Sequence, residues 1–264
     1  MEGDFNTAIV DDAAHRPWPM PKRPWVMTQT WNDLLFAHWP VEPALLRPRV
    51  PAVFELERFD GAAWIGVVPF HMTNVAPRGV PALPWASAFP ELNVRTYVRV
   101  DDRPGVYFFS LDAGSALAVQ AARMLFNLPY HSASMTVVHA NGGIEYQSRR
   151  TSAPTVELQT VYAPIGDAFL AAEDSREYFL TERYCLYHLD RRGAPYRMEI
   201  HHPRWALQPA RAAFDRNTMT DAIGIPLPDV EPLLLFAKRQ DAIAWMPSTL
   251  SAHNVRDTGE WTRT

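Results

Sequence analysis

The sequence contains very little lysine and cysteine. Of 25 basic residues only Lys22 and Lys238 are lysines, so few amines are present that could form an imine with a carbonyl substrate. Cys185 is the single cysteine, which excludes an intramolecular disulfide and a zinc site built on several thiolates. A lone thiol in a strand-like run is more often buried filler than a nucleophile.

Concentrated charge and long apolar runs are also missing. The formal net charge is −4, and no basic block is longer than a pair such as Arg149 and Arg150, so nucleic acid is not expected as a partner. No apolar run approaches the ~20 residues of a membrane-spanning helix. Residues 1–10 lack the basic start and apolar centre of a signal peptide. We therefore expect a cytoplasmic protein without a membrane partner.

The common cofactor and catalytic motifs are absent as well. The sequence has no Walker loop, no Gly-x-Gly-x-x-Gly, no Gly-x-Ser-x-Gly and no His-Glu-x-x-His. His201 and His202 are adjacent, and neighbouring residues of a strand point to opposite faces, so the two do not readily bind one ion. No metal and no cofactor are predicted.

The composition predicts one folded domain. With 47% apolar residues over 264 positions, the chain can bury a large core, and it shows no internal repeat or linker. Residues 1–24 contain four closely spaced prolines, Pro17, Pro19, Pro21 and Pro24, which disfavour both helix and sheet. We predict a flexible, proline-rich arm over residues 1–24 and a single domain over residues 25–264.

Short strands joined by turn residues predict the fold class. Alternating or apolar runs are expected to form hairpins over 54–59 with 63–75, 134–140 with 144–149, and 184–189 with 196–201. Asp60 and Gly61 mark the first of these turns. A helix is expected over 114–127 and one broken helix over 168–181. This pattern indicates an α+β protein, mainly an antiparallel β-barrel with a few capping helices, with a sandwich as the alternative.

Residues 90–100 form the most informative predicted strand, because its two faces differ sharply. One face carries Leu92, Val94, Thr96, Val98 and Val100, and the other carries Glu91, Asn93, Arg95, Tyr97 and Arg99. The polar face has three interpretations: a solvated surface, a structural network in which Glu91 pairs with Arg95, or the wall of a pocket.

Several runs of sequence resemble a known family. They are Trp-x-x-Leu-Leu-Phe-x-His-Trp at 31–39, Phe-Asp-Gly-x-x-Trp at 59–64, Val-Pro-Phe at 68–70, Glu-Leu-Asn-Val-Arg-Thr-Tyr-Val at 91–98, Gly-Val-Tyr-Phe-Phe-Ser-Leu-Asp at 105–112, Leu-Pro-Tyr at 128–130, Thr-Glu-Arg-Tyr at 181–184 and His-Pro at 202–203. The chain resembles the bacterial YqjF-like family of unknown function, in the acetoacetate decarboxylase-like superfamily. The resemblance covers residues 25 to about 245.

The resemblance implies a barrel-like fold that encloses a pocket. In the superfamily a glutamate lies on a central strand, and a lysine lies in the loop after a helix and its proline. Glu91 falls where that glutamate would be, but the matching loop reads Pro129-Tyr130-His131 and has no lysine. Decarboxylation through an imine is therefore not expected, and Lys238 is interpreted as a surface residue.

These observations define a candidate site and a ranked set of functions. The predicted catalytic residues are Glu91, Tyr130 and His131, and the predicted substrate-binding residues are Arg95, Asn93, Tyr97 and Arg123. The leading hypothesis is a pocket for a small organic acid, with lyase-like activity that does not use an imine. The alternatives are a non-catalytic ligand-binding or interaction module, and a hydrolase or isomerase that uses Glu91 and His131. No oligomeric state is predicted.

Overall fold

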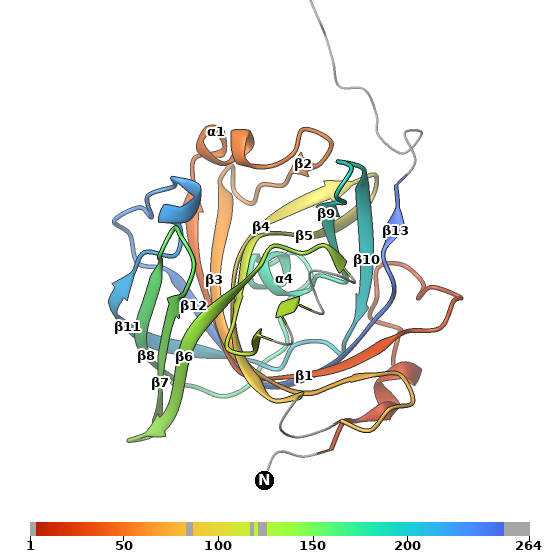
Figure 1. The fold of residues 1–264 in the computed structure, drawn as a ribbon, viewed down its shortest axis with the longest axis horizontal. Helices are drawn as coiled ribbons and strands as arrows, with labels where there is room; N and C mark the ends of the chain where they lie inside the picture. Colours follow the sequence, from red (N-terminus) through yellow and green to blue (C-terminus); the bar gives the residue numbers. More distant parts are fainter. Residues whose placement is uncertain (1–3, 83–86, 117–118, 121–125, 251–264) are drawn as a thin grey trace, which may run out of the picture.

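The computed structural model describes residues 4–82, 87–116, 119–120 and 126–250. In these residues 13 strands join in one sheet (Figure 1). The strands are β1 (Met27–Val41), β2 (Glu55–Leu56), β3 (Ala63–Pro77), β4 (Phe89–Val100), β5 (Arg103–Ala113), β6 (Tyr130–Ala140), β7 (Gly143–Arg150), β8 (Glu157–Pro164), β9 (Cys185–Leu189), β10 (Pro195–His201), β11 (Leu207–Asn217), β12 (Leu233–Ala244) and β13 (Ser248–Thr249). The helices are α1 (Pro43–Leu46), α4 (Arg176–Thr181) and the 3-10 turns η1 (Thr7–Asp11), η2 (Arg47–Arg49) and η3 (Asp221–Ile223).

The strand pairings close on themselves. They run from β3 through β4, β5, β9, β10, β12 and β1 and return to β3, so these strands form a ring. In Figure 1, β6, β7, β8 and β11 lie to one side of this ring and β13 lies to the other. The mostly-sheet α+β class with few helices is confirmed. Two pairings of β5, with β6 and with β9, are parallel, and the other strand pairings of the described residues are antiparallel.

In strand β4, the apolar and polar side chains alternate between the two faces as the sequence predicted. Leu92, Val94 and Val98 are fully buried in the largest apolar cluster, on one side of the strand. A β-bulge between Val94 and Arg95 in the pairing with β5 leaves this alternation intact, because the extra residue, Phe109, belongs to β5. The other face of β4 therefore points into the ring.

Helix α4 closes the middle of the ring. Leu180 is fully buried beside Tyr97, and its carbonyl oxygen accepts a hydrogen bond from the Tyr97 hydroxyl at 2.7 Å. The helix is shorter than the predicted 168–181, because the Ser175 hydroxyl caps it by accepting from the Tyr178 N–H at 3.1 Å. Before this cap, Phe169 forms a bridge with Leu207.

The turn, strand and helix predicted elsewhere in the chain agree with the structure to different degrees. Asp60 and Gly61 form the expected tight turn, with φ of 51° and 78°, both in the left-handed region that this turn type requires. The strand expected over 54–59 is shorter than predicted: β2 covers Glu55–Leu56 and pairs with β4, and the pairing across the turn is a single bridge between Phe59 and Ala62. The helix predicted over 114–127 falls largely on 117–118 and 121–125, outside the described residues, and Arg123 lies there too.

The segment before β1 packs on the ring. Ile9 is buried against Ile243 and Trp245, and Trp18 joins the largest apolar cluster. The sequence did not indicate these contacts, and the division into a flexible arm and one domain stays a prediction. In the described part of the chain, none of the helices has the length and apolar character needed to cross a lipid bilayer.

Candidate functional site

A cavity of about 370 Å³ lies between two apolar clusters inside the ring. One wall includes Leu34, Phe36 and Phe70, from β1 and β3. The opposite wall includes Val106 and Met198, from β5 and β10. Because most of the lining is apolar, a charged group inside the cavity is poorly solvated, and its protonation depends strongly on its few polar neighbours.

The polar face of β4 supplies a row of functional groups to this cavity. Glu91, Asn93 and Arg95 all line it. The Glu91 and Asn93 side chains belong to residues that are only 3% and 5% exposed, so this face is not a solvated surface. The sequence interpretation of β4 as a pocket wall is therefore the one that the geometry supports.

Glu91 is held in a mostly uncharged form. Burial raises the pKa of Glu91 from 4.5 to about 8, the hydrogen bond from Tyr130 opposes this rise, and the negative charge of Asp112 adds to it. The Tyr130 hydroxyl donates to Glu91 Oε2 at 3.1 Å, and the Tyr146 hydroxyl donates to the Glu91 backbone carbonyl at 2.7 Å. At neutral pH Glu91 is thus a buried acid that can give up a proton.

A second buried carboxylate lies close to Glu91. Asp112 is fully buried and receives two hydrogen bonds from Arg150, at 2.8 and 3.0 Å. This bidentate geometry is the strong form of an arginine–carboxylate pair. The Arg150 guanidinium therefore compensates Asp112, while no arginine or lysine of the described residues forms an ion pair with Glu91.

Arg95 is not paired with Glu91. No carboxylate of a described residue lies within ion-pair distance of Arg95, and its Nη2 donates to the Leu180 carbonyl at 3.3 Å. The guanidinium carbon lies 5.3 Å from the Phe36 ring centre and 5.8 Å from that of Tyr97. Its Nε has no hydrogen-bond partner among the described residues. The interpretation of Glu91 and Arg95 as one ion pair does not match this geometry.

Two more buried polar atoms of cavity residues have unused hydrogen-bonding capacity. Within the described ranges, Asn93 Oδ1 accepts no hydrogen bond and Trp205 Nε1 donates none. Both residues line the cavity, and Trp205 is 3% exposed. A buried polar atom without a partner costs about 1–3 kcal/mol, a cost that a bound molecule can remove.

Only part of the predicted site comes together. Tyr130 lines the cavity, but His131, whose backbone pairs with Asp112, is not among the described residues that do. Tyr97 is fully buried outside the lining, and its hydroxyl contacts Leu180 O and His38 Nε2 at 2.7 and 2.5 Å. Arg123 lies outside the described residues.

The second half of the chain contributes lining residues that the sequence interpretation did not select. They include Arg183, His202 and Trp205. Burial lowers the pKa of His202 to about 4, so the imidazole is neutral at physiological pH. His201 points elsewhere, with its Nε2 2.7 Å from the Ile9 carbonyl. The one signal for these residues was the pair of short runs at 181–184 and 202–203, which carried the family resemblance.

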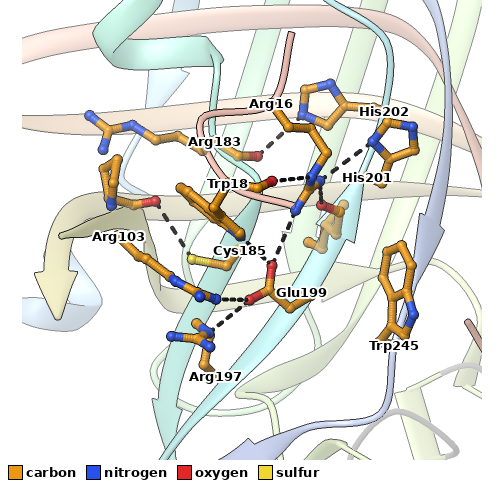
Figure 2. A network of polar contacts seen from close by, with 12 residues as sticks. Arg16, Trp18, Arg103, Arg183, Cys185, Arg197, Glu199, His201, His202 and Trp245 are labelled. Carbon is orange, nitrogen blue, oxygen red and sulfur yellow. Dashed lines mark hydrogen bonds and ion pairs between the residues drawn. The ribbon is translucent and has the colours of Figure 1, made fainter. Parts of the chain in front are cut away.

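A charged network lies next to this part of the wall (Figure 2). Glu199 accepts hydrogen bonds from Arg16 at 3.2 Å, Trp18 at 2.9 Å and Arg103 at 3.0 Å, and Arg197 lies 2.9 Å away as a further ion pair. Glu199 is 4% exposed, so three hydrogen-bond donors and one further arginine, from three separate segments, converge on one buried carboxylate.

The network fixes the N-terminal segment against wall residues of the cavity. Arg16 Nη1 donates to the Ile200 carbonyl at 2.6 Å, and His15 Nε2 lies 2.8 Å from the His202 carbonyl. Ile200 and His202 line the cavity. Residues 15–18 thus contact the backbone of residues 200–202 from outside the cavity, while the Ile200 and His202 side chains line the cavity.

The sequence matches an existing family over most of its length. Residues 28–241 match the model of DUF2071, a family of uncharacterised conserved proteins. The chain belongs to this family. The uncharacterised protein YqjF of Bacillus subtilis (strain 168) is 49% identical over 226 residues, which cover 86% of this chain and 93% of YqjF. The resemblance to YqjF-like proteins is therefore confirmed.

Solved structures show the same fold at low sequence identity. The enduracididine biosynthesis enzyme MppR complexed with pyruvate is 12% identical, with a TM-score of 0.59 over 90% of this chain and 94% of that one. Acetoacetate decarboxylase from Legionella pneumophila is 10% identical, with a TM-score of 0.57 over 95% of this chain and 98% of that one. At these identities the similarity establishes the fold alone.

Neither lysine belongs to the cavity lining. Lys238 lies on β12 with a side chain that is 71% exposed, and its Nζ pairs with Asp33 Oδ1 at 2.6 Å. Lys22 is exposed in the segment before β1. The interpretation of Lys238 as a surface residue is confirmed, and neither lysine is placed to form an imine with a molecule in the cavity. In the described part of the chain, no group of three or more His, Cys, Asp and Glu side chains is arranged to hold a metal ion.

Proposed function

We propose that this protein is an acid–base enzyme that transfers a proton between Glu91 and a small carbonyl compound bound in the cavity, without a covalent imine. The observation that carries the proposal is the buried Glu91 carboxyl, whose pKa is about 8 and whose Oε2 accepts a hydrogen bond from Tyr130. Catalytic acids are commonly tuned toward the operating pH in this way, by burial in an apolar site.

The chemistry follows from the protonated state of Glu91. The carboxylic acid donates its proton to the carbonyl oxygen of the bound compound while a water molecule takes a proton from the adjacent carbon. The electron pair of that C–H bond forms the enol, and the enol hydroxyl later gives its proton back to the Glu91 carboxylate. Return of a proton to that carbon regenerates the carbonyl group and the acid. The reaction class is a lyase-like or isomerase-like step at the carbon next to a carbonyl. We assign no role to His131, which is not among the described residues of the lining.

The fold neighbours support a carbonyl compound as the ligand. One solved neighbour holds pyruvate, and another is an acetoacetate decarboxylase. The lining of this chain has no lysine to form an imine, so the proposed activity depends on hydrogen bonding to the oxygen instead.

Proton exchange measured in D₂O tests the proposal. The purified protein is incubated with a panel of oxo acids whose carbonyl group lies next to the carboxylate or several carbons away from it, and NMR follows deuterium incorporation next to the carbonyl. We expect exchange above the buffer rate with at least one compound, and a loss of about 10²- to 10⁴-fold in Glu91→Gln. Glu145→Gln, the same change at an exposed position of β7, should keep full activity. Equal rates for wild type and Glu91→Gln would contradict the proposal.

A further inference from the structure

Arg95 gives the cavity a cation that forms no ion pair with a carboxylate in the described part of the chain. Arg183, the other arginine in the lining, is bonded to Glu57 and donates from Nε to the Phe179 carbonyl at 2.7 Å. Among the described residues, Arg95 has only uncharged hydrogen-bond partners, the Leu180 carbonyl and the Tyr97 hydroxyl, and its Nε has none. A charge in a largely apolar site normally needs an opposite charge nearby, so the geometry favours an anionic group on the ligand.

A second donor lies on the same side of the cavity. The ring of Phe36 is 5.3 Å from the Arg95 guanidinium carbon and 4.9 Å from the Trp205 ring, so both residues flank it. Trp205 Nε1–H has no partner among the described residues. An arginine fork beside an additional N–H donor is suited to a carboxylate, which has two oxygens with several lone pairs.

The backbone opposite Arg95 leaves room for this arrangement. Gly66 of β3 pairs with Arg95 of β4 and with His38 of β1. A Cβ at Gly66 would lie 3.3 Å from Arg95 Cγ and 2.8 Å from His38 Nε2. Glycine at this position allows the arginine stem and the buried histidine to lie side by side.

The cavity is too large and too apolar for a very short acid. A protein cavity of about 150 Å³ can hold a benzene molecule, so the cavity of about 370 Å³ has room for a ligand well above that size. A three-carbon acid would leave most of that volume unfilled. Trp31 stacks on Trp205 with ring centres 5.8 Å apart, and with Phe36 these rings form an aromatic wall next to Arg95.

The spacing along β4 also separates Arg95, which would bind the anionic group of a ligand, from Glu91, the proposed acid. Glu91 and Arg95 are four residues apart, which corresponds to about 13 Å between Cα atoms in an extended strand. One ligand that reaches both groups therefore carries its anion and its reacting group at different positions.

We infer that the ligand is a monocarboxylic acid with a bulky apolar or aromatic body, its carboxylate paired with Arg95 and its body lying against the Trp31, Phe36 and Trp205 wall. This inference rests on the proposed function for the reaction at Glu91, but the binding arrangement is independent of whether that reaction occurs.

Binding of a graded series tests the inference. Acetate, butanoate, hexanoate, 3-phenylpropanoate and the neutral 3-phenylpropanamide are titrated into the intact protein by calorimetry. We expect affinity to rise about fourfold per added methylene along the straight-chain acids. The amide should bind roughly 10- to 100-fold more weakly than the matching acid, because it lacks the charge-assisted pairing.

Three variants separate the roles of the residues. Arg95→Gln should lower carboxylate affinity by about 10- to 100-fold and leave amide binding unchanged, which also shows that the variant is folded. Arg99→Gln, a change of a half-exposed arginine on the same face of β4, should bind like wild type. Glu91→Gln should bind the acids at least as well as wild type.

The outcomes distinguish this inference from the proposed function. Affinity that does not depend on chain length, unchanged carboxylate binding in Arg95→Gln, or no binding of any compound to wild type would overturn the inference. Tight binding of 3-phenylpropanoate without deuterium exchange of any carbonyl compound would instead overturn the proposed function and leave the inference in place.

Discussion

Glu91 couples the stability of the fold to pH. Its pKa is 4.5 as an ordinary glutamate and about 8 in the folded protein, so between these values the folded state binds more protons than the unfolded state. Stability attributed to this residue is therefore greatest below pH 4.5 and falls as the pH rises toward 8. The residue is tolerated in the core because it can stay protonated.

The first prediction compares wild type with Glu91→Gln in urea unfolding at pH 5, 6, 7 and 8. Glutamine cannot ionise, so the variant should gain stability relative to wild type as the pH rises, on the order of 3 kcal/mol by pH 7. The exposed Glu145→Gln variant should show no such trend. A difference that is flat with pH, or that grows in the opposite direction, would contradict the assigned protonation state.

The second prediction concerns the hydrogen bond from Tyr130. This bond lowers the pKa of Glu91 and partly opposes the effect of burial. Tyr130→Phe should therefore move the pKa of Glu91 above 8, and the pH at which deuterium exchange loses half its rate should move upward. A measured midpoint below that of wild type would show that the Tyr130 hydroxyl has another role.

At the scale of elements, the third prediction is that Gly66→Ala disturbs β1, β3 and β4 together. The added methyl group would contact Arg95 and His38, and crowding of this kind in a packed site costs about 1–3 kcal/mol. Calorimetry should show weaker carboxylate binding with little change for the neutral amide, because the arginine stem is displaced. If Gly66→Ala binds carboxylates as tightly as wild type, the added methyl group does not move Arg95 enough to weaken binding, which would contradict the prediction.

The sequence predicted elements well where the signal is local. The alternation of β4 separated Leu92 and Val94 from Glu91 and Arg95, and the pair Asp60 and Gly61 specified its own turn through positive φ. The helix expected over 168–181 was too long because a capping serine and a bridge to β11 compete with helix there.

Long-range pairings were not accessible in the same way. Nothing local shows that β5 pairs in parallel with β9, or that β2 joins β4. Prediction of the site residues has the same limit. Glu91, Asn93 and Arg95 lie on one strand, so the local pattern alone grouped them as candidate site residues. His202 and Trp205 reach the cavity only because the ring closes, so their sequence positions gave no geometric reason to choose them.

For the whole molecule, Glu199 connects the N-terminal segment to β10, and the fourth prediction concerns that connection. Glu199→Gln should cost about 3–5 kcal/mol, because it leaves Arg16, Arg103 and Arg197 close together without their buried carboxylate. Arg103→Gln, at a side chain that is 38% exposed, should cost only about 0–1 kcal/mol. Urea unfolding of both variants makes the comparison, and equal effects would contradict it.

The pairing of β1 with β12 has a consequence for how the protein is made. Met27 of β1 pairs with Ala244 of β12, so the 15-residue strand β1 leaves the ribosome long before this partner exists. Until then the nascent chain exposes one unpaired edge of β1, and such edges favour pairing with other chains. We therefore expect synthesis to be the stage at which this protein is most prone to aggregate and most dependent on chaperones.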